Sequence, residues 1–230
     1  MSQPSFEARI VASARQTPNM LLLGLEAAAG FAPTHIRPGQ YAELSLAGDG
    51  SGLYAMASAP GEQPIEFLIR RGQGFSDALY GLGTGSRLSL GPALGPGFPL
   101  EATRGRDLYL LAAGTGIAAL RPVVRCVLRE RAAWGRVTLF YGVRFPRHFA
   151  FLEELAVWER HDVEVLLVTS GKHSEPFESY TGYVQDLAEE RRVPTENAHV
   201  FACGGEAMLA DVRQTFAALG LEPAHFHTNV

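Results

Sequence analysis

The segment Asp107-Leu-Tyr-Leu-Leu-Ala-Ala113 is a continuous apolar run, and Gly114-Thr115-Gly116-Ile117 follows it directly. Apolar runs without alternation are typical of strands buried on both faces of a parallel sheet. Glycines here let the backbone approach a ligand closely, and the N–H groups of a following helix suit a pyrophosphate. The same glycines would also make an ordinary strand-to-helix turn, and Ala119 stands where G-x-G-x-x-G has its third glycine. At this segment alone both interpretations stay open.

Strand and helix patterns alternate from this segment to the end of the chain. The next stretch predicts a helix that begins near Ala118, with apolar residues on one side and Arg121, Arg125 and Arg129 on another. Pro122 fits that helix only in its first turn. Further strands are expected at 137–141, 163–169 and 199–202, and further helices at 151–160, 183–191 and 207–219. This alternation predicts a parallel sheet with helices on both faces.

The first hundred residues have a different texture, with short strands separated by glycine- and proline-rich turns. Strands are expected at 6–11, 20–25, 41–46, 65–69 and 87–90, and turns at 37–40, 48–52, 60–62 and 81–85. This spacing predicts a closed barrel or a sandwich. The fold class is therefore all-β plus α/β: an N-terminal antiparallel β-barrel over residues 1–103, followed by a parallel-sheet α/β domain over residues 104–230.

Composition and charge exclude several classes of protein. The chain has 230 residues, 47% of them hydrophobic, and a net charge of −4, which gives no basic excess for nucleic acid. No apolar stretch approaches the ~20 residues of a membrane span. The N-terminal residues lack the pattern of a secretory signal, so cytoplasmic placement is the default expectation. Cys126 and Cys203 are too few for an all-cysteine cluster, and no metal site is expected.

Two more predicted strands of the second half end in glycines. Tyr141-Gly142-Val143-Arg144 follows one strand and Cys203-Gly204-Gly205-Glu206 follows another. Ligands of open α/β sheets bind at the carboxyl ends of strands, so three such ends on one sheet edge favour a dinucleotide. In the first half, Tyr54 offers a flat aromatic face beside small residues, although an ordinary edge strand explains that stretch equally simply.

Seven short motifs follow one another along the chain. They are Pro38-Gly39-Gln40-Tyr41, Tyr54-Ala55-Met56-Ala57-Ser58-Ala59-Pro60, Gly91-Pro92, Ala113-Gly114-Thr115-Gly116-Ile117-Ala118-Ala119-Leu120-Arg121, Phe140-Tyr141-Gly142-Val143-Arg144, Gly182-Tyr183-Val184-Gln185 and Cys203-Gly204-Gly205-Glu206-Ala207-Met208. Each motif is weak by itself. In this order and at this spacing they resemble the ferredoxin–NADP reductase superfamily over nearly the whole chain.

The resemblance implies a flavin held between the two domains and a nicotinamide dinucleotide beside it. Its flavin set is Tyr54, stacking on the ring, with Ala55, Met56, Ala57, Ser58, Ile69, Arg70, Arg71, Gly74, Phe75 and Ser76. Its NAD(P)H set is Gly114, Thr115, Gly116, Ile117, Arg144, Ser170, Lys172, Tyr183, Cys203, Gly204 and Met208. Tyr54 and Cys203 are the residues expected to flank the reacting rings, where a hydride passes from NAD(P)H to FAD.

Three departures from the family pattern bear on the cofactors. Gly52 stands where the family has an arginine on the flavin phosphate, and losing such a bond costs ~1.5–3 kcal/mol. FMN is therefore an alternative to FAD. Cys-Gly-Gly replaces the usual Cys-Gly-Pro at residues 203–205. Gly171 stands where NADP-specific members tend to carry a basic residue, which favours NADH, with Ser170, Lys172 and Tyr183 as an alternative 2′-phosphate site.

The implied function is an NAD(P)H-dependent flavin oxidoreductase that passes single electrons to a separate acceptor, a ferredoxin or an oxygenase-type partner. Two alternatives are a free-flavin or diaphorase-type reductase and a non-catalytic electron-relay subunit of a larger complex. The two domains carry similar charge balances, so a sequence-level field identifies no docking face for the acceptor. The sequence predicts no oligomeric state.

Overall fold

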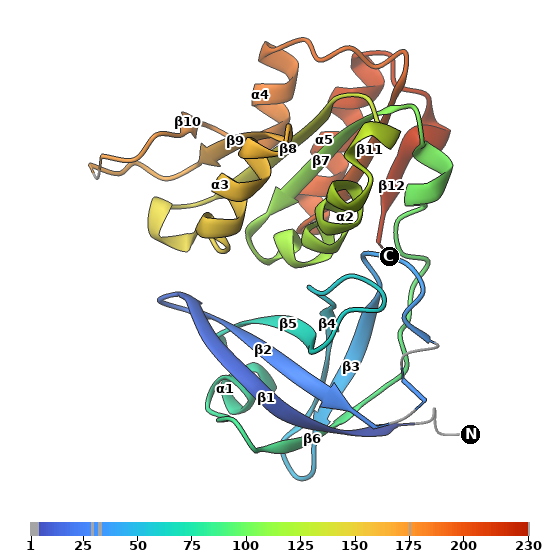
Figure 1. The fold of residues 1–230 in the computed structure, drawn as a ribbon. Coiled ribbons are helices and arrows are strands. Elements are labelled where there is room, and N and C mark those ends of the chain that lie inside the picture. Colours follow the sequence, from blue (N-terminus) through green and yellow to red (C-terminus); the bar gives the residue numbers. More distant parts are fainter. Residues whose placement is uncertain (1–4, 29, 32–33, 175, 230) are drawn as a thin grey trace.

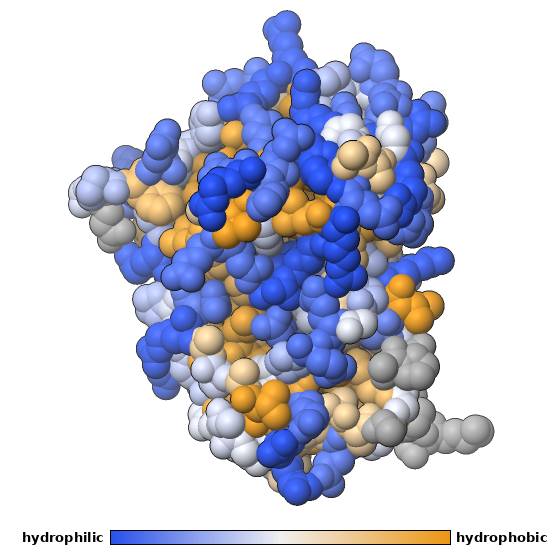
Figure 2. Space-filling model, in the orientation of Figure 1, coloured by the Kyte–Doolittle hydropathy of each residue, from blue (hydrophilic) through white to orange (hydrophobic). Residues whose placement is uncertain are grey.

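The computed structural model describes residues 5–28, 30–31, 34–174 and 176–229. The strands in these ranges form two sheets. Figure 1 shows a β-barrel built by the first part of the chain, with an α/β layer stacked against one end of it. The surface in Figure 2 is mostly hydrophilic, with separate hydrophobic patches on both halves. None of the helices in the described ranges is long and apolar enough to cross a membrane.

The barrel is an antiparallel sheet, as the sequence predicts, but it has six strands and not the five expected. Its strands are β1 (Phe6–Thr17), β2 (Met20–Ala27), β3 (Tyr41–Leu46), β4 (Gly50–Ala55), β5 (Ile65–Arg70) and β6 (Arg87–Leu90), in the order β4-β3-β6-β1-β2-β5. A bridge between Met56 and Phe67 joins the two edge strands and closes the barrel. Its core holds the buried side chains of Ile10, Leu23 and Phe67.

Two features of the barrel differ from the sequence expectation. The turn expected over residues 48–52 is shorter, because β4 begins at Gly50 and pairs with β3 along its whole length. Gly48 and Gly50 both have positive φ, which makes the tight reversal possible. A short helix that the sequence did not predict, α1 (Phe75–Tyr80), lies between β5 and β6.

The second sheet is parallel throughout and covered by helices on both faces, as expected. Its strands are β7 (Asp107–Ala113), β8 (Val137–Val143), β9 (Glu164–Thr169), β10 (Tyr180–Thr181), β11 (Ala198–Cys203) and β12 (Phe226–Thr228), in the order β10-β9-β8-β7-β11-β12. Its helices are α2 (Ile117–Arg129), α3 (Leu152–Arg160), α4 (Val184–Glu190) and α5 (Glu206–Ala218). Short 3₁₀ turns occupy Leu100–Thr103, Gly114–Gly116, Arg131–Ala133, Pro146–His148 and Pro223–His225.

Helix α2 begins one residue before the expected start, yet Pro122 lies outside its first turn. Pro122 is the sixth residue of the helix, so helical residues precede and follow it. The proline has no N–H to donate to the carbonyl of Ala118, so one helical hydrogen bond is missing there. The 3₁₀ turn Gly114–Gly116 leads directly into the helix, which keeps the start of α2 next to the end of β7.

One apolar core runs from the α/β layer into the barrel. It joins Leu110 of β7 and Ile117 of α2 with Met20, Ala57 and Leu68 of the barrel. The helices α4 and α5 pack on the opposite face of the parallel sheet in a separate core. The two halves therefore share buried contacts, and the expected division at residue 103 falls in the segment that connects β6 with β7. That division stays a prediction.

The strand order reverses beside β7. From β7 the chain moves outward through β8 and β9 to β10, and then returns to place β11 on the other side of β7. The loops that leave β7 and β11 therefore diverge from one point at the carboxyl edge of the sheet. Such a switch point is where open α/β sheets bind ligands.

Candidate functional site

A cavity of about 380 Å³ lies at the carboxyl edge of the parallel sheet and reaches the barrel. The barrel contributes Asn19, Met20 and Arg70 to its wall. The α/β layer contributes Ala113, Gly114, Gly142, Val143, Arg144, His148, Ser170, Gly182, Tyr183, Val184, Gln185 and Met208. Both halves of the chain are thus needed to form this cavity.

Several glycines line the cavity or the turns beside it, and some of them are packed without room for a side chain. A Cβ on Gly116 would overlap the carbonyl oxygen of Cys203, so the turn after β7 rests directly on the loop after β11. A Cβ on Gly204 would lie 2.7 Å from the Sδ atom of Met208. Gly114 has a φ of +55° and open space around its Cβ position. A ligand can therefore approach the backbone at the start of α2.

The wall of the cavity is positively charged. Arg70 from the barrel and Arg144, directly after β8, both line it, together with His148 of the α/β layer. Burial lowers the pKa of His148, and the charges of Arg147, Arg144 and Arg70 lower it further. The same field that disfavours a charged imidazole favours an anionic ligand such as a pyrophosphate.

Gln185 is a buried polar residue at the N-terminal end of α4 and is one of the residues that line the cavity. Within the described ranges, its Oε1 atom has no hydrogen-bond partner. A buried acceptor without a partner costs ~1–3 kcal/mol. A ligand with hydroxyl or amide donors, such as a nicotinamide dinucleotide, would offer donors for it, so the residues present fit that group.

Cys203 lies at the end of β11, beside the turn after β7. Burial raises the pKa of its thiol to about 12, so the thiol is neutral at physiological pH. A neutral, partly buried thiol is a poor nucleophile and acts through its size and shape. Cys203 is therefore suited to packing against a ligand and not to covalent chemistry.

Tyr54 lies on β4 with its ring partly exposed. The ring centroid is 6.2 Å from that of Phe75 at the start of α1, with the planes tilted by 51°. Burial raises the pKa of the Tyr54 hydroxyl. A Cβ on Gly52 would lie 3.0 Å from Cε2 of Tyr54 and 3.2 Å from Cδ1 of Phe75. The two rings therefore take the space into which an arginine at position 52 would extend.

Several residues of the expected flavin set have side chains inside the protein. Those of Met56, Ala57, Ser58 and Ile69 are buried, as is that of Ile117 in the other half. The Ser58 hydroxyl accepts a hydrogen bond from the backbone N–H of Glu66. Contacts of Met56, Ala57, Ile69 and Ile117 with a ligand would have to come from backbone atoms.

Three other members of that set lie in the loop that leads from β5 into α1 or at the start of this helix. Arg71 pairs with Asp77 across 3.2 Å. The hydroxyl of Ser76 donates to the carbonyl of Gln73, and Gly74 precedes the helix with a φ of +63°. These contacts shape the loop that follows β5, next to Arg70.

The cavity brings together six of the expected site residues: Arg70, Gly114, Arg144, Ser170, Tyr183 and Met208. Thr115, Gly116, Cys203 and Gly204 form the adjacent turns, whereas Tyr54, Ala55 and the exposed Lys172 lie outside the cavity lining. Sequence reasoning missed Asn19, Met20, His148 and Gln185 as lining residues. Asn19 and Met20 reach the cavity only through the β1–β2 hairpin, for which the local sequence holds no functional signal.

Comparison with known proteins finds related oxidoreductases. The model of the oxidoreductase NAD-binding domain family matches residues 110–214. Ferredoxin–NADP reductase B of Sorangium cellulosum is 30% identical over 241 residues, covering 96% of this chain and 96% of that protein. Sulfhydrogenase 2 subunit gamma of Pyrococcus furiosus is 24% identical over 203 residues, covering 83% of this chain and 70% of that subunit.

A solved structure shows the same fold. The crystal structure of a ferredoxin NADP⁺ reductase from Neisseria gonorrhoeae with bound FAD and NADP has a TM-score of 0.83, at 18% identity, over 100% of both chains. With the Sorangium relative this defines the class: an oxidoreductase with a β-barrel followed by an α/β layer. The chain belongs to the ferredoxin–NADP reductase family, whose members are NAD(P)H-dependent flavin oxidoreductases.

Proposed function

We propose that this protein oxidises NADH at a bound FAD and passes the electrons singly to a separate ferredoxin-type acceptor. The observation that carries the proposal is the cavity shared by Arg70 of the barrel and Gly114 and Met208 of the α/β layer. When bound, the flavin supplies the chemistry of accepting a hydride and releasing electrons one at a time.

The residues of the chain bind, orient and enclose the two cofactors. Tyr54 supplies an aromatic face on the barrel side, and Gly114 to Gly116 supply open backbone N–H groups at the start of α2. The loop Cys203–Gly204 packs against that turn and limits the space for a nicotinamide ring. Hydride transfer needs two rings in contact with water excluded, so alignment is the main contribution of the protein.

The backbone after β9 supports NADH as the preferred donor. A Cβ on Gly171 would lie 2.5 Å from the carbonyl oxygen of Arg144 and 2.6 Å from Cε1 of Phe145. No basic side chain fits at this position without moving that backbone, so the usual partner of a 2′-phosphate has no place there. Both cysteines are free thiols, which suits a reducing compartment, and we include the cytoplasm in the proposal.

A second candidate function is that of an electron-relay subunit. The similarity to a sulfhydrogenase gamma subunit favours it, because that relative is by name one subunit of an assembly. In that case the same cavity would serve, and the acceptor would be a protein held in a stable complex.

The test is an anaerobic titration of the purified protein, with the flavin extracted and identified by mass. We expect FAD, bleaching by NADH faster than by NADPH, and reoxidation by a [2Fe–2S] ferredoxin or by ferricyanide. Colourless protein that reduces added free flavin would favour a free-flavin reductase instead. Bound flavin that neither nucleotide bleaches would contradict the proposal and favour a relay without turnover.

A further inference from the structure

Arg121 is a buried cation at the boundary between the two halves of the molecule. Only 2% of the residue is exposed, although it lies on the polar side of α2. Its Nε and Nη2 atoms donate to both carboxylate oxygens of Glu154 on α3, at 2.6–3.0 Å. The guanidinium carbon also lies 4.5 Å from the ring centroid of Phe151. Arg121 is therefore firmly held within the α/β layer.

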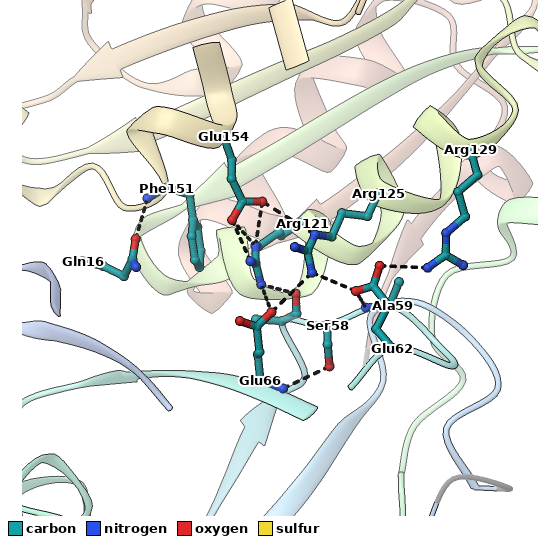
Figure 3. Close-up of polar contacts among 11 residues, drawn as sticks. Gln16, Ser58, Ala59, Glu62, Glu66, Arg121, Arg125, Arg129, Phe151 and Glu154 are labelled. Carbon is teal, nitrogen blue, oxygen red and sulfur yellow. Dashed lines mark hydrogen bonds and ion pairs between the residues drawn. The ribbon is translucent and has the colours of Figure 1, made fainter. Parts of the chain in front are cut away.

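The remaining terminal nitrogen of Arg121 reaches across to the barrel. Its Nη1 atom donates to Glu66 of β5 at 2.6 Å and to the backbone carbonyl of Ala57 at 2.8 Å (Figure 3). Ala57 comes two residues after the end of β4, in the stretch that follows Tyr54, and its N–H donates to the carbonyl of Glu66. One guanidinium thus holds the carbonyl of Ala57 and the side chain of Glu66. Glu66 belongs to β5, the strand to which the N–H of Ala57 is hydrogen-bonded.

Two further arginines on the same side of α2 extend this contact. Arg125 donates to Glu62 at 2.8 Å and to Glu66 at 3.3 Å, and Arg129 donates to Glu62 at 2.8 Å (Figure 3). Glu62 in turn accepts a hydrogen bond from the backbone N–H of Ala59. These residues are four apart along the helix and so share a face. Exposure increases from Arg121 to Arg129, whose side chain is 51% exposed.

The N-terminal end of α2 adjoins the expected nucleotide site. The helix begins at Ile117, directly after the turn Gly114–Gly116. Arg121 is five residues beyond Gly116, which corresponds to about 7.5 Å of helix rise. A short piece of helix therefore connects the turn expected to meet the NAD(P)H pyrophosphate with the backbone expected to line the flavin ring.

We propose that Arg121 is a positioning residue that sets the distance between the two cofactor sites by holding the Ala57 carbonyl to α2. This inference rests on the proposed function. Removing one partner of a buried ion pair leaves the other uncompensated, and a displacement of about 1 Å in a reacting pair can lower a rate about 100-fold. A lysine would keep the charge but lose the planar fork that contacts Glu154, Glu66 and Ala57 together.

The test compares Arg121→Lys and Glu66→Gln with Arg129→Gln as the matched control on the same helix face. In the FAD-loaded proteins we expect the bleaching rate at saturating NADH to fall about 10- to 100-fold in Arg121→Lys and clearly in Glu66→Gln. The half-saturating NADH concentration and the reoxidation of dithionite-reduced protein by ferricyanide should change by less than about threefold, because neither depends on ring alignment. Arg129→Gln should match the wild type in all three.

Hydrogen exchange of the flavin-free proteins gives a readout that does not depend on turnover. The amides of Ala57 and Glu66 should exchange faster in Arg121→Lys than in Arg129→Gln, at equal global stability in urea. Unchanged bleaching in both Arg121→Lys and Glu66→Gln, with FAD retained, would overturn the inference while sparing the proposed function. Wild-type protein that binds FAD without being bleached by NADH would overturn both.

Discussion

The backbone of Gly116 lies against the carbonyl oxygen of Cys203, so closely that a Cβ on Gly116 would overlap it. Gly116 follows β7, and Cys203 ends the adjacent strand β11, at the point where the strand order reverses. This contact joins the turn that opens α2 to the loop expected beside the nicotinamide.

Gly116→Ala should therefore disrupt the nucleotide site. The added methyl group must displace the Cys203 backbone, at a cost of about 1–3 kcal/mol. We expect NADH-dependent bleaching to fall by about 100-fold, since the two loops separate. Gly83→Ala is the control, because its Cβ position is open and Gly83 is not among the residues that line the cavity. Stopped-flow bleaching and urea midpoints of both variants measure the difference, and equal losses in the two would contradict the explanation.

The thiol of Cys203 should take no part in proton transfer. Burial raises its pKa to about 12, so the neutral form persists from pH 6 to pH 9. The bleaching rate by NADH should show no titration of a thiol in this range, and iodoacetamide at pH 8 should label Cys203 very slowly, since its thiolate fraction is about 1,000-fold below that of an ordinary cysteine. Rapid labelling at pH 8, measured by peptide mass, would disprove this assignment.

Nucleotide preference should respond to position 170 and not to position 171. Ser170 is exposed and lines the cavity, so Ser170→Arg can place a guanidinium near a 2′-phosphate. We expect NADPH efficiency relative to NADH to rise by about 10-fold, the value of one charge-assisted hydrogen bond. Gly171→Arg should lower efficiency with both nucleotides, because its Cβ meets the carbonyl of Arg144. Steady-state kcat/KM with NADH and with NADPH measures this preference. A change of preference to NADPH in Gly171→Arg would contradict the prediction.

Stability should fall in mild acid through His35. Burial lowers the pKa of His35 to about 4, with Glu62 partly opposing the shift. The unfolded chain therefore binds more protons than the folded one between about pH 6.5 and pH 4, so the free energy of unfolding falls as pH falls through this window and is level above it. His35→Gln should reduce the slope measured by urea unfolding at pH 5–7, and the rest of the slope should remain because burial also lowers the pKa of His148, His199 and His227. The same slope in His35→Gln as in the wild type would argue against this origin.

The strands and helices that carry strong local patterns could be predicted from the sequence. The apolar run of β7 predicts a buried strand, and the glycines after it predict a turn, because both patterns lie within a few neighbouring residues. The structure confirms the strand and the turn. The alternation that follows likewise predicts the parallel sheet, because handed crossovers leave few other arrangements. Local pattern fails where a strand is short, as with the three residues of β12, which pair only with β11.

The contacts between the two halves could not be predicted. Periodicity places Arg121 on the polar side of a helix, yet its partners Glu66 and Ala57 are 55 and 64 residues away in the chain. The same limit applies to the cavity: Asn19 and Met20 enter it because the β1–β2 hairpin extends toward the sheet edge. Tertiary packing determines which distant residues meet, and local sequence patterns do not predict these contacts.

The central claim is that one aromatic ring lies on Tyr54 while a second lies beside the Cys203 loop, in the space between the barrel and the parallel sheet. A crystal structure of the FAD-loaded protein with NAD⁺ tests it most directly. We expect the isoalloxazine against Tyr54 and the nicotinamide bordered by Cys203, Gly204 and Met208. Density for either ring elsewhere on the protein, with side chains occupying this space, would contradict the account.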